Sequence, residues 1–472
     1  MEIIDLSIFT GSGQALVSNI NLSVHANGTL TIIGETGSGK SLVAQAVMGL
    51  LPNDFVVSGS IRLGGSAPIP ASDREKLRSF WARHVMLLPQ EPRLALNPTM
   101  QIGRQIAEAE QYPGQAHEMT HAVGLSDSVA WAYPHMLSGG MAQRVLIATG
   151  LTSAAPLLIA DEPTKGLDDD RVNQATELLA TCAAHGRTLF VITHDIRVAK
   201  ALDGDIVVMR DGRVIEQGKS SQILDRPSQS YTQEWLDADP ARWTKSKRPK
   251  ERSDTVVELS NVCFRFPKQT GLIDNVSLRI QRGRILALCG QSGCGKTTLG
   301  NIALGLLKPV NGQVRWLGGT DPYRRDRIAR RLRPRFQKLH QDPNASFAPH
   351  RTIHRQFHDL HSVLPLGALN EKLPAILDRL DISTNLLKRY PAEISGGEAQ
   401  RLAIARILLF EPDFVLADEP TSRLDPIVQR RTIELITELG MQQQMAVMLI
   451  THDKALANAI ADETIHLRSS RA

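Results

Sequence analysis

The stretch Gly34-Glu-Thr-Gly-Ser-Gly-Lys-Ser41 decides the fold of the first half of the chain. The apolar, β-branched run before it predicts a buried strand over 29–33, and apolar side chains at helical spacing after it predict a helix that begins near Lys40. A glycine-rich turn between a strand and a helix lets backbone N–H groups converge on an anion, and the helix N-terminus adds its positive dipole end. The sequence therefore predicts a phosphate-binding loop, in which Lys40 reaches the phosphates and Ser41 ligates Mg²⁺.

The same element returns as Gly290-Gln-Ser-Gly-Cys-Gly-Lys-Thr297. The two loop lysines are 256 residues apart, the two Ser-Gly-Gly motifs and the two Asp-Glu pairs 257, and the two Thr-His-Asp motifs 258. Offsets this constant indicate a duplicated domain. We predict α/β domains with largely parallel sheets over 1–235 and 256–472, joined by a polar, charged linker over 236–255.

Composition is that of an ordinary globular chain, with 42% apolar and 22% charged residues in 472, a formal net charge of +5 and a pI near 9.0. Four irregularly spaced cysteines are too few for a disulfide framework or a Cys-x-x-Cys zinc site, which favours the reduced cytosol. The N-terminal residues lack the pattern of a signal peptide, and no apolar run approaches 18 residues. We expect a chain that does not itself span a membrane.

Two Asp-Glu pairs follow apolar runs of four residues, so each aspartate should end a strand at the edge of the sheet where ligands bind. Asp161 and Asp418 are expected to hold Mg²⁺ through water. Glu162 and Glu419 are expected to act as general bases, an effect worth about 10²–10⁴ in rate. The alternative for an isolated Asp-Glu pair is a solvated turn.

Two Ser-Gly-Gly motifs, at 138–140 and 395–397, each precede an amphipathic helix. Serine is a favoured N-cap residue, so a purely structural role is open. The same geometry also offers bare N–H groups to an anion.

In this combination and order the motifs resemble those of the ATP-binding cassette (ABC) family, and the resemblance covers nearly all of both halves. Within that family, the segments 88–98, 133–144, 226–232 and 341–347 resemble the importer ATPases for dipeptides, oligopeptides and nickel. The resemblance implies two tandem P-loop NTPase domains, each with a RecA-like core sheet, an antiparallel β subdomain and a helical subdomain.

The resemblance also implies roles for further residues. His194 and His452 would contact the γ-phosphate, and Gln90 and Gln341 would sense Mg²⁺ and the permease, with Gln337 a competitor for the second glutamine. Each ATP would bind between the halves, so that Lys40 faces the second Ser-Gly-Gly motif and Lys296 faces the first. The adenine ring would stack on Phe9 or Phe266, although either side chain could equally belong to the core.

The predicted cofactors are ATP and Mg²⁺. The expected nucleotide-binding residues are Gly34, Glu35, Thr36, Gly37, Ser38, Gly39, Lys40 and Ser41, then Gly290, Gln291, Ser292, Gly293, Cys294, Gly295, Lys296, Thr297 and Thr298, with Ser138, Gly140, Ser395, Gly397, Asp168, Asp425, Phe9 and Phe266. The expected metal-binding residues are Ser41, Thr297, Gln90, Gln341, Asp161 and Asp418.

As a function, the resemblance implies an ATP-hydrolysing subunit that drives an importer of peptides, nickel or related small solutes. Its partners would be two integral membrane permease subunits, docked on 91–137 and 342–394, and an extracytoplasmic solute-binding protein. The chain would lie peripherally on the cytoplasmic face of the inner membrane. The alternatives are a soluble duplicated ABC ATPase acting on the ribosome or DNA, and an assembly ATPase of phosphonate metabolism.

Two other features suggest ligands. The segment 324–335 contains seven arginines, but a solvated basic helix is the favoured interpretation and no specific nucleic acid is expected. His350, His354, His358 and His361 follow helical spacing and could bind Zn²⁺ or Ni²⁺. A polar helix face is favoured for these histidines.

Overall fold

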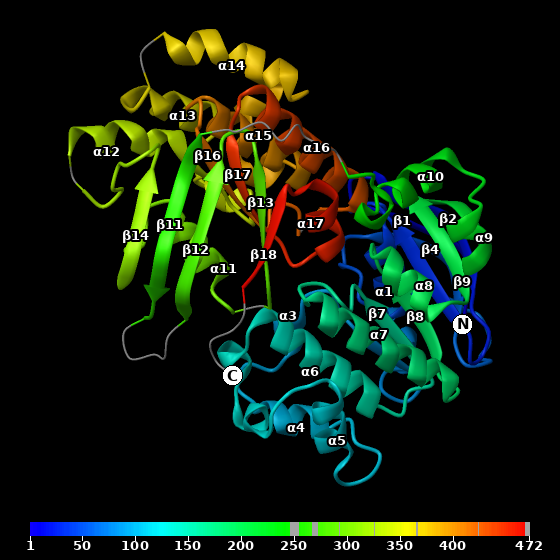
Figure 1. The fold of residues 1–472 in the computed structure, drawn as a ribbon. Coiled ribbons are helices and arrows are strands. Elements are labelled where there is room, and N and C mark those ends of the chain that lie inside the picture. The colour runs from blue at the N-terminus through cyan, green and yellow to red at the C-terminus, as the bar shows by residue number, and fades with distance from the viewer. Residues whose placement is uncertain are drawn as a thin grey trace. The chain divides into compact units, whose positions relative to one another are not determined.

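The computed structural model describes residues 1–245, 254–266, 272–291, 293–324, 326–364, 367–422 and 424–467. They form two compact units (Figure 1). The first comprises Met1–Asp239 with Asp425–Ile427, and the second comprises the described residues of Pro240–Leu424 and Val428–Ala472. Part of the predicted linker, 246–253, lies outside the described residues.

The first unit is built on a six-stranded sheet of order β10-β9-β3-β8-β7-β6, in which all strands but β10 run parallel. Its strands are β3 (Thr29–Gly34), β6 (Val85–Leu88), β7 (Leu157–Asp161), β8 (Thr188–Ile192), β9 (Asp205–Arg210) and β10 (Arg213–Lys219). A separate antiparallel sheet has the order β2-β1-β4-β5, with β1 (Glu2–Phe9), β2 (Ala15–Ser23), β4 (Val56–Arg62) and β5 (Ile69–Pro70). The phosphate loop follows β3, an inner strand.

The helices of the first unit include a run of short ones between β6 and the Ser-Gly-Gly motif. In chain order they are α1 (Lys40–Val47), α2 (Arg74–Arg78), α3 (Pro92–Ala95), α4 (Ile102–Ala107), α5 (Gln115–Ala122), η1 (Asp127–Trp131), η2 (Pro134–Met136), α6 (Gly139–Thr152), α7 (Asp169–Ala184), α8 (Ile196–Leu202), α9 (Ser220–Asp225) and α10 (Ser230–Asp237). Helix α1 begins at Lys40, as the sequence predicted.

The second unit repeats this plan with a parallel sheet of order β15-β16-β17-β13-β18 and an antiparallel sheet of order β12-β11-β14. The strands are β11 (Thr255–Phe264), β12 (Ile273–Gln281), β13 (Ile285–Cys289), β14 (Asn311–Trp316), β15 (Phe336–Leu339), β16 (Phe414–Asp418), β17 (Ala446–Ile450) and β18 (Glu463–His466). The helices are η3 (Pro240–Arg242), α11 (Lys296–Ala303), α12 (Arg327–Leu332), η4 (Arg333–Arg335), η5 (Asn344–Ser346), α13 (Ile353–His358), η6 (Asp359–Ser362), α14 (Ala368–Arg379), η7 (Thr384–Lys388), η8 (Pro391–Glu393), α15 (Gly396–Leu408), α16 (Pro426–Gln442) and α17 (Lys454–Ile460).

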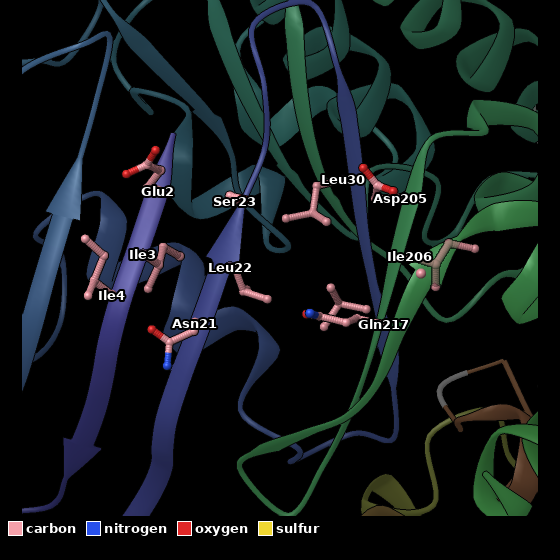
Figure 2. Close-up of a pocket in the computed structure, with 12 residues that line it drawn as sticks. Glu2, Ile3, Ile4, Asn21, Leu22, Ser23, Leu30, Asp205, Ile206 and Gln217 are labelled. Atoms are coloured by element: carbon pink, nitrogen blue, oxygen red, sulfur yellow. The ribbon is translucent and has the colours of Figure 1, made fainter. Parts of the chain in front are cut away.

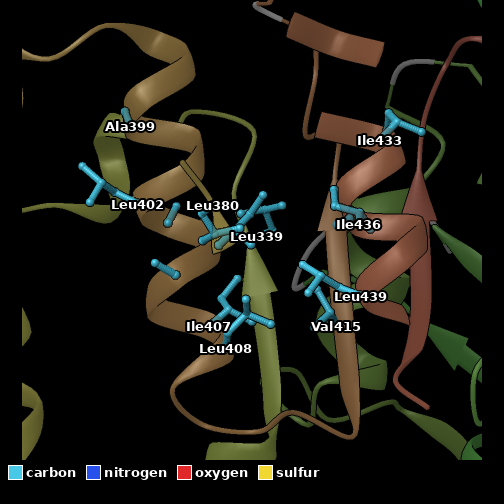
Figure 3. Close-up of a cluster of buried hydrophobic side chains, with 14 of the residues drawn as sticks. Leu339, Leu380, Ala399, Leu402, Ile407, Leu408, Val415, Ile433, Ile436 and Leu439 are labelled. Atoms are coloured by element: carbon cyan, nitrogen blue, oxygen red, sulfur yellow. The ribbon is translucent and has the colours of Figure 1, made fainter. Parts of the chain in front are cut away.

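The central strands are continuous apolar runs because both faces of each sheet are covered. Along β7, Leu157 and Ile159 belong to the core on one face, whereas Leu158 and Ala160 belong to the core on the other. In the second unit, Val415 of β16 packs with apolar residues of α15 and α16 (Figure 3), and Phe414 joins the core on the opposite face. Burial on both faces is typical of parallel sheets in α/β proteins. The predicted fold class is confirmed.

No helix in the described part of the chain is long and apolar enough to cross a membrane.

Candidate functional site

The loop after β3 is held by its own lysine. Lys40, only 7% exposed, donates from Nζ to the carbonyl oxygens of Gly34 at 2.8 Å and Glu35 at 2.5 Å. Burial is the largest influence on the Lys40 side chain and lowers its pKa. Gly37 has a φ of 88°, and a Cβ there would meet open space within 4 Å. The loop thus leaves room for an anion beside a buried ammonium group and the start of a helix, which fits a phosphate.

The loop after β13 has the same construction. Lys296 Nζ donates to the carbonyl oxygens of Gly290 at 2.7 Å and Gln291 at 3.0 Å. Gly295, which precedes α11, has a φ of 101°, and Cys294 beside it is buried. Ser292 lies outside the described residues. Both predicted loops therefore have the strand-loop-helix context that phosphate binding requires.

Asp161 is the last residue of β7 and is buried. The Ser41 hydroxyl hydrogen-bonds to its carboxylate, while its Oδ1 atom has no hydrogen-bond partner among the described residues. Burial raises the pKa of Asp161 to about 6. A buried carboxylate beside a phosphate-loop hydroxyl is the donor set that Mg²⁺ prefers, so these residues fit the predicted metal.

Glu162 and Glu419 share an uncommon backbone conformation, with φ values of 52° and 46°. Their backbone N–H groups donate to Ile192 O at 2.8 Å and to Ile450 O at 3.0 Å, which ties each glutamate to the neighbouring strand. Non-glycine residues at positive φ are rare and cluster at functional sites. The equal geometry in both units supports the predicted importance of these two residues.

Each glutamate has a histidine partner. His194 Nδ1 lies 2.7 Å from Glu162 Oε2, and His452 Nδ1 lies 3.5 Å from Glu419 Oε1. Burial opposes ionisation of Glu162 and of His194, but their mutual attraction outweighs it, so the pKa of Glu162 is lowered and that of His194 is raised. The structure thus brings the predicted base and the predicted γ-phosphate contact together in each unit.

The two candidate glutamines of the second unit have different hydrogen-bond partners. Gln341, two residues after β15, donates from Nε2 to Glu419 Oε2 at 2.8 Å, whereas Gln337, within β15, donates from Nε2 to Pro334 O at 2.7 Å, three residues back in the chain. Gln341 is therefore the glutamine that reaches the site. Gln90 follows β6 at the same two-residue distance, which is the equivalent place in the first unit.

Lys338 is a site residue that the sequence analysis missed. Its Nζ lies 2.9 Å from Asp418 Oδ2, and Thr297 Oγ1 donates to Asp418 Oδ1 at 3.1 Å. Counting back three residues from each glutamine gives Lys338 in the second unit but Leu87 in the first. Asp418 thus already contacts a cation, whereas Asp161 Oδ1 has no hydrogen-bond partner within the described ranges.

Both Ser-Gly-Gly motifs lie at helix starts. Ser138 Oγ accepts from Met141 N at 3.2 Å at the start of α6, and Ser395 Oγ accepts from Glu398 N at 3.3 Å at the start of α15. Glu398 Oε2 in turn accepts from the backbone N–H of Ser395 at 2.7 Å, which closes a capping box in the second unit. The N-cap geometry is confirmed. Binding of a nucleotide by these motifs, with Gly140 and Gly397, stays a prediction.

Asp168 caps α7 by accepting from Arg171 N at 3.1 Å, and Asp425 directly precedes α16. Phe9 ends β1 half-buried, whereas Phe266 is 38% exposed and packs edge-on against Phe264 with ring centroids 5.0 Å apart. Nucleotide binding by Asp168 and Asp425, and adenine stacking on Phe9 or Phe266, stay predictions.

Tyr231, in α10, is a second residue whose part the sequence analysis did not assign. Its hydroxyl accepts a hydrogen bond from the backbone N–H of Glu35, inside the phosphate loop, at 3.1 Å. The ring is buried under the Arg210 guanidinium, with 4.8 Å to the centroid. The only signal in the sequence is the Ser-Tyr-Thr motif of segment 226–232. The end of the first unit therefore supports its phosphate loop directly.

A cavity of about 490 Å³ in the first unit lies apart from this chemistry (Figure 2). Glu2, Asn21, Asp205 and Gln217 line it together with Leu30, which lies near the beginning of β3. Since the phosphate loop follows the other end of β3, this cavity is not the predicted nucleotide site.

The predicted histidine stripe is wrong as a single helical face. Helix α13 begins at Ile353, so His350 lies before it in a turn, and His361 lies in the following 3₁₀ turn η6. His358 and His361 do contact each other, with ring centroids 4.8 Å apart. The arginine-rich segment forms the short helix α12 and the turn η4, and Arg335 there pairs with the buried Asp413 at 2.9 Å.

Comparison with known proteins identifies the family. The family model described as ABC transporter matches residues 17–165 and 273–422, together more than half of the chain. The chain is 32% identical to an uncharacterised ABC transporter ATP-binding protein, YejF, of Escherichia coli K12, over 96% of this chain and 90% of that protein. The chain belongs to the ABC transporter family, and as an ATP-binding protein of that family it is an ATPase.

Two further relatives carry more specific names. The peptidoglycan transport ATP-binding protein YejF of Agrobacterium fabrum is 31% identical over 100% of this chain and 91% of its own length. The glutathione import ATP-binding protein GsiA of Pectobacterium atrosepticum is 30% identical over 98% of this chain and 83% of its own length.

Among solved structures, an archaeal ribosome recycling factor, aABCE1, matches over 98% of this chain and 87% of its own, with a TM-score of 0.69 and 22% identity. At this identity the likeness concerns the fold alone, and it agrees with the predicted tandem ABC ATPase architecture.

Replacing Asp161 by Asn should stabilise the nucleotide-free protein at neutral pH. Its folded-state pKa of about 6 lies above its usual value of 3.8, so ionising Asp161 costs stability as the pH rises from about 4 to about 6. The free energy of unfolding of Asp161→Asn should therefore exceed that of wild type by an amount that grows across that window. Above the window the difference should level off at about 1–3 kcal/mol. Thermal unfolding of both proteins from pH 4.5 to 8 measures it, and a constant difference across the window would contradict this prediction.

Replacing Lys338 by Leu, the residue at the matching place in the first unit, should lower the thermal stability of the nucleotide-free protein. It leaves a nearly buried Asp418 without its cation, at a cost of about 3–5 kcal/mol. Added Mg-ATP should stabilise this variant more than wild type, because Lys338 no longer competes for the carboxylate. Lys338→Arg, which keeps the charge, is the control. Equal Mg-ATP shifts for wild type and Lys338→Leu would show that Lys338 does not compete with the metal.

Proposed function

We propose that this chain is the energy-coupling ATPase of an importer for peptides or peptide-like small solutes. The observation that carries the proposal is that both units keep a phosphate-loop lysine, a strand-end Asp-Glu pair and a histidine that faces the glutamate. The relatives named for peptidoglycan transport and glutathione import match over nearly the whole chain. Their names support a peptide-like solute, whereas none of them supports nickel.

Within each unit, the roles follow from the contacts. Lys40 and Lys296 would exchange their loop carbonyls for phosphate oxygens. Glu162 and Glu419, held by their histidines, would orient a water molecule and accept its proton. Mg²⁺, when bound near Asp161 and Asp418, would neutralise the charge of the phosphates.

The importer would also need membrane partners. We propose two integral membrane permease subunits and an extracytoplasmic solute-binding protein, with the chain placed at the cytoplasmic face of the membrane. The segments 91–137 and 342–394 are the proposed permease contacts, because each follows a site glutamine and leads into a Ser-Gly-Gly helix. The predicted sharing of each ATP between the two halves stays part of the proposal.

A soluble role on the ribosome or DNA is not favoured. The likeness to the ribosome recycling factor concerns the fold alone, whereas relatives named for peptidoglycan transport and glutathione import match at 31% and 30% identity. A phosphonate-pathway assembly role has no support among these relatives.

The double variant Glu162→Gln/Glu419→Gln tests the proposal. Without the two general bases, ATP turnover should fall by about 10²–10⁴ while ATP binding persists, since the phosphate loops are unchanged. Affinity capture of this variant with ATP from gently solubilised membranes of its native cells should recover two integral membrane proteins. The same capture with Lys40→Ala/Lys296→Ala, which cannot hold the phosphates, is the control and should recover fewer of them.

Capture of ribosomes, nucleic acid or soluble enzymes without a membrane protein would overturn the importer function. Turnover at the wild-type rate by the double variant would instead remove both glutamates from the mechanism.

A further inference from the structure

Two histidines and an aspartate form a compact cluster in the helical part of the first unit, away from the nucleotide loops. His117 and His121 lie one turn apart on α5, and Asp127 begins η1. Within the described residues, these three make up the group whose ligand atoms all lie within 4.8 Å of one another. The histidine stripe around 350–361, which the sequence pattern had suggested for metal binding, forms no such group there.

The distances are close to those that a metal ion imposes. His121 Nε2 lies 2.7 Å from Asp127 Oδ1, and His117 Nδ1 lies 3.5 Å from the same oxygen. The two imidazole rings meet edge to face with centroids 4.6 Å apart. Ligand atoms bound at about 2.0–2.2 Å from a common ion lie roughly 3–3.5 Å apart. The three ligand atoms of the cluster all lie within 4.8 Å of one another, so a bound ion would draw them slightly closer together.

The backbone of α5, which carries the two histidines, is held by packing on its inner face and by a hydrogen bond at its start. Ala116 and Thr120, on the inner face of α5, are buried, so the outer face presents His117 and His121. Glu110 Oε1 accepts from Ala116 N at 2.8 Å and secures the start of the helix.

Asp127 is held in the same way, because its neighbours Leu125 and Val129 are both buried at 4% exposure. The three ligands themselves keep side-chain exposures of 70% for His117, 50% for His121 and 70% for Asp127. An ion in solution can therefore reach all three without a change of the fold.

The donor set selects the class of ion. Two imidazoles and one carboxylate suit zinc, nickel and related first-row metals, whereas Mg²⁺ and Ca²⁺ prefer oxygen ligands alone. Three protein ligands would leave one or more positions for water. A bound ion would take the lone pair of His121 Nε2, because a metal ligand must be unprotonated at the atom that binds.

We propose that His117, His121 and Asp127 form a surface site for a divalent first-row transition metal, which links the end of α5 to η1. The site uses none of the residues expected to bind the nucleotide, so this proposal does not depend on the importer function.

Zinc binding to the full nucleotide-free chain, purified without a polyhistidine tag, tests the site. Equilibrium dialysis against a competing chelator should show one more equivalent of bound Zn²⁺ in wild type than in His117→Ala/His121→Ala. Asp127→Asn, which keeps the size of the side chain, should weaken that equivalent at least tenfold. His354→Ala/His358→Ala removes two exposed histidines of the second unit at the same spacing and should bind zinc as wild type does.

Zinc should also raise the thermal unfolding temperature of wild type more than that of His117→Ala/His121→Ala. All three ligands are exposed, so the variants should fold, and ATP binding checks that they do. Equal zinc uptake by wild type and His117→Ala/His121→Ala would overturn the proposal. Loss of the same equivalent in His354→Ala/His358→Ala would overturn it as well, since the ion would then lie elsewhere.

Discussion

A buried ammonium group must keep hydrogen-bond partners, and this requirement shapes both halves of the chain. In each unit the loop lysine binds two carbonyl oxygens of its own loop, Lys40 those of residues 34 and 35 and Lys296 those of residues 290 and 291. These hydrogen bonds keep the loop curved, so that its backbone N–H groups stay available to bind an anion. In each sheet one strand separates the strand before this loop from the strand that ends in the acidic pair, β8 between β3 and β7 and β17 between β13 and β16. The strands are parallel, so the loop and the acids lie at the same edge of the sheet.

The two units are duplicates in plan but differ around the strand-end aspartate. Asp161 accepts from the Ser41 hydroxyl and has one oxygen with no hydrogen-bond partner in the described part of the chain, whereas Asp418 is paired with Lys338 and Thr297. The first loop is also supported by Tyr231, from the segment that follows the last strand of its unit. Because a cation at the metal position competes with Mg²⁺, we expect the two sites to respond differently to the metal.

The sequence allowed the strand-loop-helix elements, the strand-end acids and the helix caps to be predicted, because each depends on residues close together in the chain. Lys338 and Tyr231 were missed because their partners lie 80 and 196 residues away. Periodicity alone also misplaced the histidine stripe, since the chain turns before Ile353 and again after His358. His117 and His121 have the same spacing within one helix, but their third ligand is set by a 3₁₀ turn that periodicity does not reveal.

We expect each unit to bind one ATP through its own loop lysine. Equilibrium binding of ATP to Glu162→Gln/Glu419→Gln, with Lys40→Ala or Lys296→Ala added singly, measures this stoichiometry. We expect two equivalents of ATP per chain without a lysine substitution and one equivalent with either. Two equivalents in the presence of either alanine substitution would contradict it.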